Sequence, residues 1–214
     1  MRVAIVSDIH GNRHAFEAVL DAIEASECAE MWCLGDLVGY GAEPDACVEL
    51  ARRHAAICLA GNHDLGVRGD LPLEQFSRGA ALAARWTQET ITAETREYLN
   101  SLEPLNLDET VGLYHASPRD PVWEYVLSSL QAELCLDVQG HRVCLIGHSH
   151  VALSFCRVPG SPATGQTRAA DEQLDLDAPG AVYRRIDYDI EGAAAAIRAA
   201  RLPDSLAERL AYGQ

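Results

Sequence analysis

Five short polar clusters, each following a run of apolar residues, constrain the fold of this chain more than any other feature. The clusters are Ser7–Asn12, Gly35–Asp36, Gly61–Asp64, His115 and Gly147–His150. Short apolar runs such as Val-Ala-Ile-Val at 3–6 are typical of parallel strands buried on both faces. The repeated arrangement predicts an α/β sheet wrapped by helices, with every polar cluster at the carboxyl end of a strand.

Helical periodicity fills the segments between these runs. Phe16, Val19, Leu20 and Ile23 recur at i, i+3, i+4 and i+7, which predicts an amphipathic helix. The expected strands cover 3–6, 31–34, 56–60, 111–114, 143–146, 151–155 and a stretch near 181–188. The expected helices cover 13–26, 44–53, most of 74–102, the region of Trp123 to Leu130, 190–200 and 203–212.

The whole chain, 1–214, is expected to form one domain, because 48% apolar residues suffice for one sizeable core. Residues 159–180 are rich in Pro, Gly and acids, and they predict an exposed, mobile loop with one short strand at most. Neither a signal segment nor an apolar run of about 18 residues is found, so no membrane association and a cytoplasmic location are expected. The odd count of seven cysteines, without a Cys-x-x-Cys pair, predicts free thiols in a reducing compartment.

The five clusters carry ligands suited to divalent cations. Their predicted metal ligands are Asp8, His10, Asp36, Asn62, His115, His148 and His150. If the chain stays extended from Asp8 to His10, both side chains point the same way and can hold one ion. Asp36 ends the neighbouring strand, where its carboxylate could bridge two ions. The mixture of carboxylate, amide and imidazole suits Mn, Fe, Zn or Ni.

Each cluster alone also has a purely structural interpretation. Asp8 could cap a backbone amide, Gly-Asp is an ordinary turn, and a lone His115 at a strand end is more often structural than a ligand. Their shared position at the ligand-binding edge of a sheet favours the metal interpretation. Asp64 could orient the imidazole of His63 and raise its basicity, and the structural alternative for Gly61–Asp64 is a polar turn after a strand.

These clusters, in this order and spacing, resemble those of the calcineurin-like metallophosphoesterases. The match runs from residue 3 to about residue 157, and the run from His115 to Pro121 looks like the small prokaryotic branch of YfcE-type phosphodiesterases. The resemblance implies a four-layer α/β/β/α sandwich with mixed sheets flanked by helices. It implies two divalent cations, Mn first among them, and metal-dependent hydrolysis of a phosphodiester or phosphomonoester by attack of hydroxide.

The resemblance also implies a role for each ligand. One cation would be held by Asp8, His10, Asp36 and His150, and the other by Asp36, Asn62, His115 and His148. His63 would face the substrate phosphate with Asp64 behind it. Relatives usually carry an Asn-Pro-Gly-Ser stretch before the last strands, which this chain lacks, so a shorter second sheet or an incomplete pocket wall is expected.

The net charge of −15 bears on the substrate, because such a field repels nucleic-acid backbones. A small phosphorylated molecule, for example a nucleotide, is therefore the expected partner, and long nucleic acid is not. Two rival functions stay open: a non-catalytic protein-binding scaffold on the same fold, and a mononuclear metal sensor or lyase. Tyr40, Arg119 and Trp123 are candidates for the pocket wall.

Overall fold

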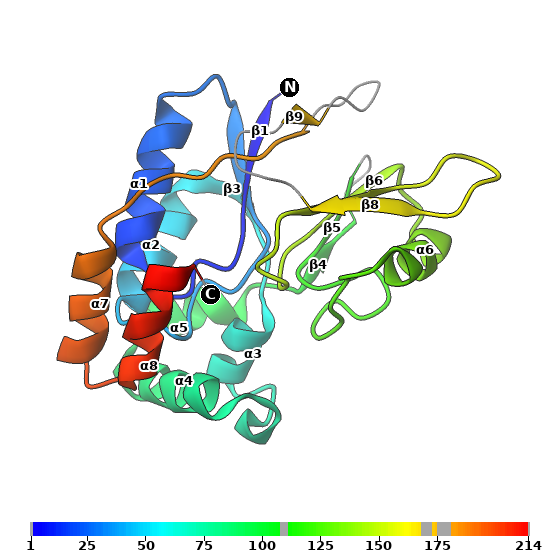
Figure 1. Ribbon diagram of the computed structural model, residues 1–214. Helices are drawn as coiled ribbons and strands as arrows, with labels where there is room; N and C mark the ends of the chain where they lie inside the picture. The colour runs from blue at the N-terminus through cyan, green and yellow to red at the C-terminus, as the bar shows by residue number, and fades with distance from the viewer. Residues whose placement is uncertain (1, 108–110, 168–172, 175–180, 214) are drawn as a thin grey trace.

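The computed structural model describes residues 2–107, 111–167, 173–174 and 181–213. Two sheets lie face to face, and helices flank them on their outer sides (Figure 1). The amino-terminal sheet is parallel, in the order β1-β2-β3, with β1 paired to β2 from Val3↔Glu30 to Val6↔Cys33. Its elements are β1 (Val3–Val6), α1 (Arg13–Glu24), β2 (Glu30–Cys33), α2 (Pro44–His54) and β3 (Ala55–Cys58).

These five elements match the expected strands and helices to within three residues at each end. The sequence contains the caps that place them: the Asn12 side chain accepts from the Ala15 amide, and Pro44 begins α2. Phe16 and Val48 bury their side chains against Met31 and Cys33 on the outer face of the sheet. The 3.6-residue periodicity of the first helix therefore identified its buried face correctly.

The second sheet has the order β4-β5-β6. Its strands are β4 (Leu105–Asn106), β5 (Val111–Tyr114) and β6 (Val143–Ile146). β5 and β6 are parallel, whereas β4 runs antiparallel to β5. Leu34 and Leu59 of the first sheet pack against Leu113 of the second, with Trp32, Ile57, Val111 and Leu145 around them. This apolar layer joins the two sheets and brings the carboxyl ends of their parallel strands to one edge.

The helical region after β3 is divided into four pieces. These are α3 (Asn62–Arg68), η1 (Leu73–Gln75), α4 (Arg78–Thr90) and α5 (Ala93–Asn100). The cluster at Gly61–Asp64 forms the N-cap and first turn of α3. Ser77 and Thr92 are the N-caps of α4 and α5, because their side chains accept from backbone amides in the first turn of each helix.

Helix α6 (Ser129–Val138) covers the outer face of the second sheet, where Ala132 and Cys135 pack with Ile146 and Phe155. The expected helix at Trp123 to Leu130 was therefore placed too early. Ser128 caps α6 through the Gln131 amide, and the residues before it form turns and irregular chain. Helices, two sheets and a further helix thus form the expected four-layer α/β/β/α arrangement.

The segment 159–180 contains more strand than expected. β7 (Leu153–Cys156) pairs with β8 (Thr164–Thr167), and β9 (Gln173–Leu174) pairs with β10 (Ala181–Val182), both antiparallel. The prediction of one short strand at most was wrong, because both β8 and β9 lie within this segment, β8 as the second strand of a hairpin with β7. The strand expected near 181–188 ends at Val182. Residues 168–172 and 175–180 lie outside the described part, so the effect of the absent Asn-Pro-Gly-Ser stretch stays a prediction.

The carboxyl-terminal elements are α7 (Ile190–Ala199), α8 (Asp204–Glu208) and η2 (Arg209–Tyr212). They return to the amino-terminal half of the molecule, where α7 contacts α1 (Figure 1). Asp189, which caps α7, lies 3.8 Å from the Nδ1 atom of His14 on α1. All seven cysteines are free thiols. Among the described residues, no helix is both long enough and apolar enough to cross a membrane.

Candidate metal centre

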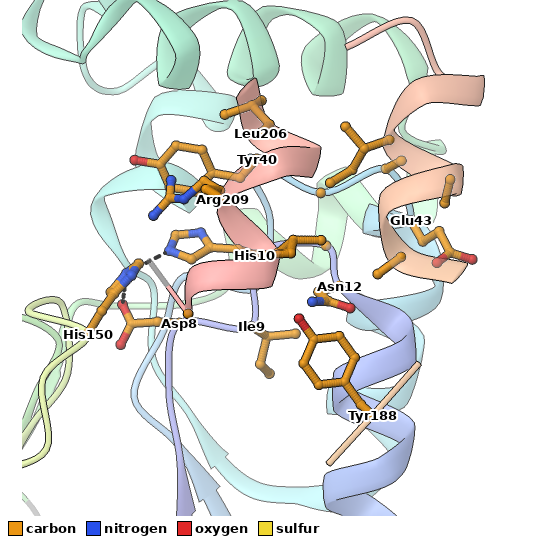
Figure 2. A pocket seen from close by; sticks show the side chains of 18 residues that line it. Asp8, Ile9, His10, Asn12, Tyr40, Glu43, His150, Tyr188, Leu206 and Arg209 are labelled. Atoms are coloured by element: carbon orange, nitrogen blue, oxygen red, sulfur yellow. Dashed lines mark hydrogen bonds and ion pairs between the residues drawn. The ribbon is translucent and has the colours of Figure 1, made fainter. Parts of the chain in front are cut away.

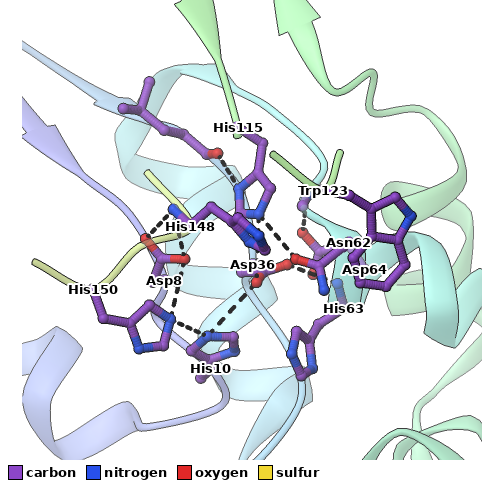
Figure 3. A network of polar contacts seen from close by, with 12 residues as sticks. Asp8, His10, Asp36, Asn62, His63, Asp64, His115, Trp123, His148 and His150 are labelled. Carbon is purple, nitrogen blue, oxygen red and sulfur yellow. Dashed lines mark hydrogen bonds and ion pairs between the residues drawn. The ribbon is translucent and has the colours of Figure 1, made fainter. Parts of the chain in front are cut away.

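The five polar clusters meet at one edge of the two sheets, as the sequence predicted (Figure 3). Backbone hydrogen bonds continue the strand pairing into the clusters and fix their positions. The Asp8 amide donates to Gly35 O at 2.9 Å, and the His10 amide donates to Asp36 O at 2.8 Å. On the second sheet, the Gly147 amide donates to His115 O at 2.8 Å. Clusters 26 to 32 residues apart in sequence are thereby held side by side.

The backbone at these clusters is left-handed rather than extended. Five of the seven predicted ligand residues have positive φ: Asp8, His10, Asp36, His148 and His150. The hypothesis that the chain stays extended from Asp8 to His10 was therefore wrong. Non-glycine residues in this region cost about 1–3 kcal/mol each and concentrate at functional sites. The strain is maintained here by the hydrogen bonds that fix the strand ends.

One half of the site consists of Asp8, His10 and His150, whose ligand atoms lie within 4.8 Å of one another. The Nε2 atoms of His10 and His150 are 3.0 Å apart, and Nε2 of His150 is 3.4 Å from Oδ1 of Asp8. The His148 amide donates to both oxygens of Asp8. This contact holds the Asp8 carboxylate in place from the second sheet.

The other half consists of Asp36, His115 and His148, with Asn62 beside them. Nδ1 of His115 donates to Leu34 O at 2.9 Å, which leaves the lone pair of Nε2 facing the site. That Nε2 atom lies 3.1 Å from Oδ1 of Asn62. Nε2 of His148 is buried and has no hydrogen-bond partner. All four side chains are at most 5% exposed.

Asp36 lies between the two halves. Its Oδ2 atom is 3.6 Å from Nε2 of His10 and 3.6 Å from Nε2 of His115, while its Oδ1 atom accepts from the His63 amide at 2.8 Å. Burial and the nearby carboxylates of Asp64 and Asp8 raise the pKa of Asp36 well above its ordinary value. Positive charge nearby stabilises the ionised form of a carboxyl group that is buried among other carboxylates.

The protonation states of the histidines fit bound cations. Nδ1 of His10 donates to Val38 O at 3.1 Å, so the Nε2 atom that faces Asp36 is an unprotonated acceptor. Burial lowers the pKa of His10 to about 3 and that of His148 to about 4, and it also lowers the pKa of His115. Neutral imidazoles are the form that binds metal. Several imidazole lone pairs therefore converge on the Asp36 carboxyl group, an arrangement that divalent cations would satisfy.

His63 lies at the edge of this cluster. Its ring packs against the rings of His10 at 4.7 Å and Phe76 at 5.2 Å, and its Nδ1 atom is buried without a hydrogen-bond partner. Burial, followed by the nearby histidines, lowers the pKa of His63 well below its ordinary value. Distance alone would also allow His63 to join His10 and Asp36 around an ion.

Asp64 does not contact the imidazole of His63 in the way the sequence suggested. Its carboxylate accepts from the backbone amides of Gly61, Leu37 and Val38, at 2.9 to 3.2 Å. The prediction that Asp64 orients the His63 imidazole directly was therefore wrong. Asp64 instead connects the loop after β2 to the start of α3 by hydrogen bonds. It positions Asp36 and His63 through the backbone, because both lie within this loop and this helix turn.

Sequence reasoning missed several side chains around the site. Tyr125 stacks on the ring of His148 at 4.1 Å, and Phe76 contacts His63. No pattern in the sequence distinguishes these aromatics from others. Of the three candidates for the pocket wall, Tyr40 does line a pocket beside Asp8 and His10, whereas Trp123 packs on Phe76. Arg119 pairs with Glu124 at 3.0 Å.

Comparison with known proteins identifies the family. The model of the calcineurin-like phosphoesterase family matches residues 1–152, well over half of the chain. The chain therefore belongs to the calcineurin-like phosphoesterases. The resemblance inferred from the five clusters is confirmed, while the assignment to the YfcE-type branch stays a prediction.

Relatives of similar length support this assignment. An uncharacterized protein of Methanocaldococcus jannaschii is 33% identical over 99% of this chain and 98% of its own length. A crystal structure of a metallophosphoesterase from Sphaerobacter thermophilus is 35% identical, with a TM-score of 0.86 over 100% of this chain and 99% of that one. A hypothetical protein from Pyrococcus horikoshii shares the fold at 17% identity, with a TM-score of 0.69 over 97% and 96% of the two chains.

Proposed function

We propose that this protein is a dinuclear metal-dependent phosphoesterase that hydrolyses the ester bond of a small phosphorylated substrate. The observation that carries the proposal is the position of Asp36, whose Oδ2 atom lies 3.6 Å from the unprotonated Nε2 atoms of both His10 and His115. A carboxylate between two imidazole groups is suited to bridging two cations. Membership of the calcineurin-like phosphoesterase family supports the same chemistry.

The proposed ligands divide into two sets that share Asp36. Asp8, His10 and His150 complete the first set, and Asn62, His115 and His148 complete the second. Mn²⁺ is the first candidate for both positions, and Fe, Zn or Ni also suit these ligands. When bound, two such cations lower the pKa of water to give a nucleophile near neutral pH and neutralise charge on the phosphate oxygens.

His63 is the proposed catalytic side chain. Its ring lies against that of His10, at the edge of the ligand cluster, and it is 5% exposed. A ring N–H in this position can donate to a phosphoryl oxygen or protonate the leaving oxygen, and such a group contributes about 10²–10⁴ to the rate. Asp64 is a positioning residue, since its three backbone hydrogen bonds fix the segments that carry His63 and Asp36.

The net charge of −15 supports a small substrate over a long nucleic acid, because only the immediate surroundings of bound cations would attract a phosphate. The alternative is a non-catalytic scaffold that uses metal for stability. The presence of His63 beside the seven proposed ligands favours catalysis, because a structural site would not need a buried imidazole beside the ligands.

The test combines metal analysis with hydrolysis of aryl phosphates. Protein purified after reconstitution with Mn²⁺ is expected to contain two ions per chain and to hydrolyse 4-nitrophenyl phosphate or bis(4-nitrophenyl) phosphate. Two ions without hydrolysis of either ester would favour the scaffold. One ion per chain would contradict the shared role of Asp36 and favour a mononuclear centre.

A further inference from the structure

A pocket opens beside the Asp8, His10 and His150 group, and its opposite wall comes from the carboxyl-terminal segment (Figure 2). Tyr188, Ile197 of α7, Leu206 of α8 and Arg209 of η2 form this wall. The family model ends at residue 152, so the wall lies outside the part of the chain that defines the family. The pocket therefore combines a proposed metal centre with a surface that can distinguish among phosphorylated substrates.

Arg209 places a cation in this pocket. Its guanidinium carbon lies 4.6 Å from the centroid of the Tyr40 ring, and the Tyr40 ring lies 4.7 Å from that of His10 and 4.5 Å from that of His63. The guanidinium of Arg209 and the rings of His10 and His63 thus lie against the same aromatic side chain. Arg209 is the only arginine among the described residues that line the pocket, and these residues include no lysine.

The surroundings of Arg209 suit an anion that reaches past the metal centre. Stacking on Tyr40 uses the face of the guanidinium, whereas recognition of phosphate uses the N–H donors in its plane. The carboxylate of Glu43, which also lines the pocket, lies 2.7 Å from Nε of Arg13 and 3.4 Å from Nε2 of His14. The Arg13 guanidinium compensates the charge of Glu43, so Glu43 repels a bound anion less.

The remaining wall is apolar. Ile9, Ile197, Leu206 and Leu210 line the pocket together with the ring of Tyr188. A small apolar or aromatic body would be buried between these side chains, while charged groups lie at Arg209 and at the metal ligands. The pocket consequently combines two positions for anions with an apolar space beside them.

We propose that Arg209 is a specificity-determining residue that binds a second phosphate group of the substrate, remote from the ester that is hydrolysed. This inference rests on the proposed function, since the metal centre anchors the first phosphate. The favoured substrates are small molecules with two phosphate groups separated by a short apolar or aromatic body. The loss of such a charge-assisted contact is expected to weaken binding by about ten- to a hundredfold.

The test measures inhibition of aryl phosphate hydrolysis by alkane-α,ω-diol bisphosphates with two to six carbons, each compared with the matching alkyl monophosphate. The flexible series samples a range of distances between the phosphates. The wild-type protein is expected to bind its best bisphosphate at least tenfold more tightly than the monophosphate. Calorimetric titration of the metal-loaded protein with the same compounds provides a readout independent of turnover.

Three variants assign the effect to Arg209. Arg209→Gln is expected to abolish the bisphosphate preference with little change in kcat on the aryl ester, and Arg209→Lys to restore it in part. Arg201→Gln is the matched control, because it removes a positive charge from the exposed turn between α7 and α8, outside the pocket. It is expected to keep the preference.

The outcomes separate this inference from the proposed function. Hydrolysis of aryl esters without any bisphosphate preference in the wild type would overturn the role of Arg209 and leave the phosphoesterase intact. A preference that Arg209→Gln retains, or that Arg201→Gln reduces equally, would also overturn it, since the cause would then be general electrostatics. Absence of aryl ester hydrolysis would refute the proposed function itself, and calorimetry would still decide whether Arg209 binds the second phosphate.

Discussion

Substituting Gly61 by Ala should disable the metal centre through a single methyl group. Gly61 has φ −98° and ψ 177°, a conformation that alanine adopts without strain. A Cβ atom at this position would lie 2.0 Å from Oδ1 and 2.5 Å from Cγ of Asp36. It would also lie 2.5 Å from the backbone nitrogen of Asp36, which a change of rotamer cannot relieve. The Asp36 carboxylate therefore has to move by about 1 Å or more to reach normal contact.

The cost follows from the contacts that this movement breaks. Overpacking of a filled interior costs about 1–3 kcal/mol. The hydrogen bond from the His63 amide to Oδ1 of Asp36, now 2.8 Å long, contributes about 1.5–3 kcal/mol because its acceptor is charged. The expected loss of unfolding free energy is therefore about 2.5–6 kcal/mol. If Asp36 bridges two ions as proposed, a displacement of its carboxylate by about 1 Å is expected to lower kcat by about 10²-fold or more.

The assay compares three quantities for Gly61→Ala and for the control Gly140→Ala, whose added methyl group meets no atom within 4 Å. These are the metal content after dialysis, the urea unfolding midpoint and the rate of aryl phosphate hydrolysis. The control should match the wild type in all three. A Gly61→Ala protein with two ions per chain and an unchanged rate would refute the central position of Asp36.

Three other perturbations test the site. His63→Ala should retain both ions, measured by metal analysis, while its rate falls by about 10²–10⁴-fold; an unchanged rate would exclude His63 from catalysis. Removal of two ions by a chelator should lower the melting temperature by about 10–20 °C relative to protein with ions at a hundredfold excess over Kd, and a constant melting temperature would contradict coupling of metal to folding. Burial lowers the pKa of His10 from 6.5 to about 3, so unfolding of the metal-free protein takes up a proton below pH 6.5. Relative to His10→Gln, the metal-free wild type should therefore lose about 2 kcal/mol of stability between pH 7 and pH 5 in urea titrations, and a gain would reverse the sign of this reasoning.

The strands at the site were predictable because their signals are local. Val3–Val6, Val111–Tyr114 and Val143–Ile146 are uninterrupted apolar runs, and the structure has strands at these residues. The elements that were missed or misplaced depend on pairing with another strand or on a cap. Strand β8 exists because it pairs with β7, and helix α6 begins at Ser129 because Ser128 accepts from the Gln131 amide.

The roles of individual side chains were less accessible to sequence reasoning. His63 and Asp64 are adjacent in the chain, which suggested a direct contact between them. Because they occupy the first turn of α3, their side chains diverge, and Asp64 turns to the amides of Leu37 and Val38. Neighbours in sequence need not be neighbours in space when the backbone is helical.

The sequence by itself determined which residues could reach the site, because the polar clusters follow apolar runs and parallel strands end at a common edge. It also determined the kind of ligand present, since the identity of carboxylate, amide and imidazole groups does not depend on folding. Only the tertiary structure decided how these groups face one another. Left-handed turns at Asp8, Asp36 and His148 aim their side chains inward, and the carboxyl-terminal segment supplies Arg209 to the pocket. Such arrangements depend on hydrogen bonds and packing between segments far apart in the chain, for which a local pattern contains no signal.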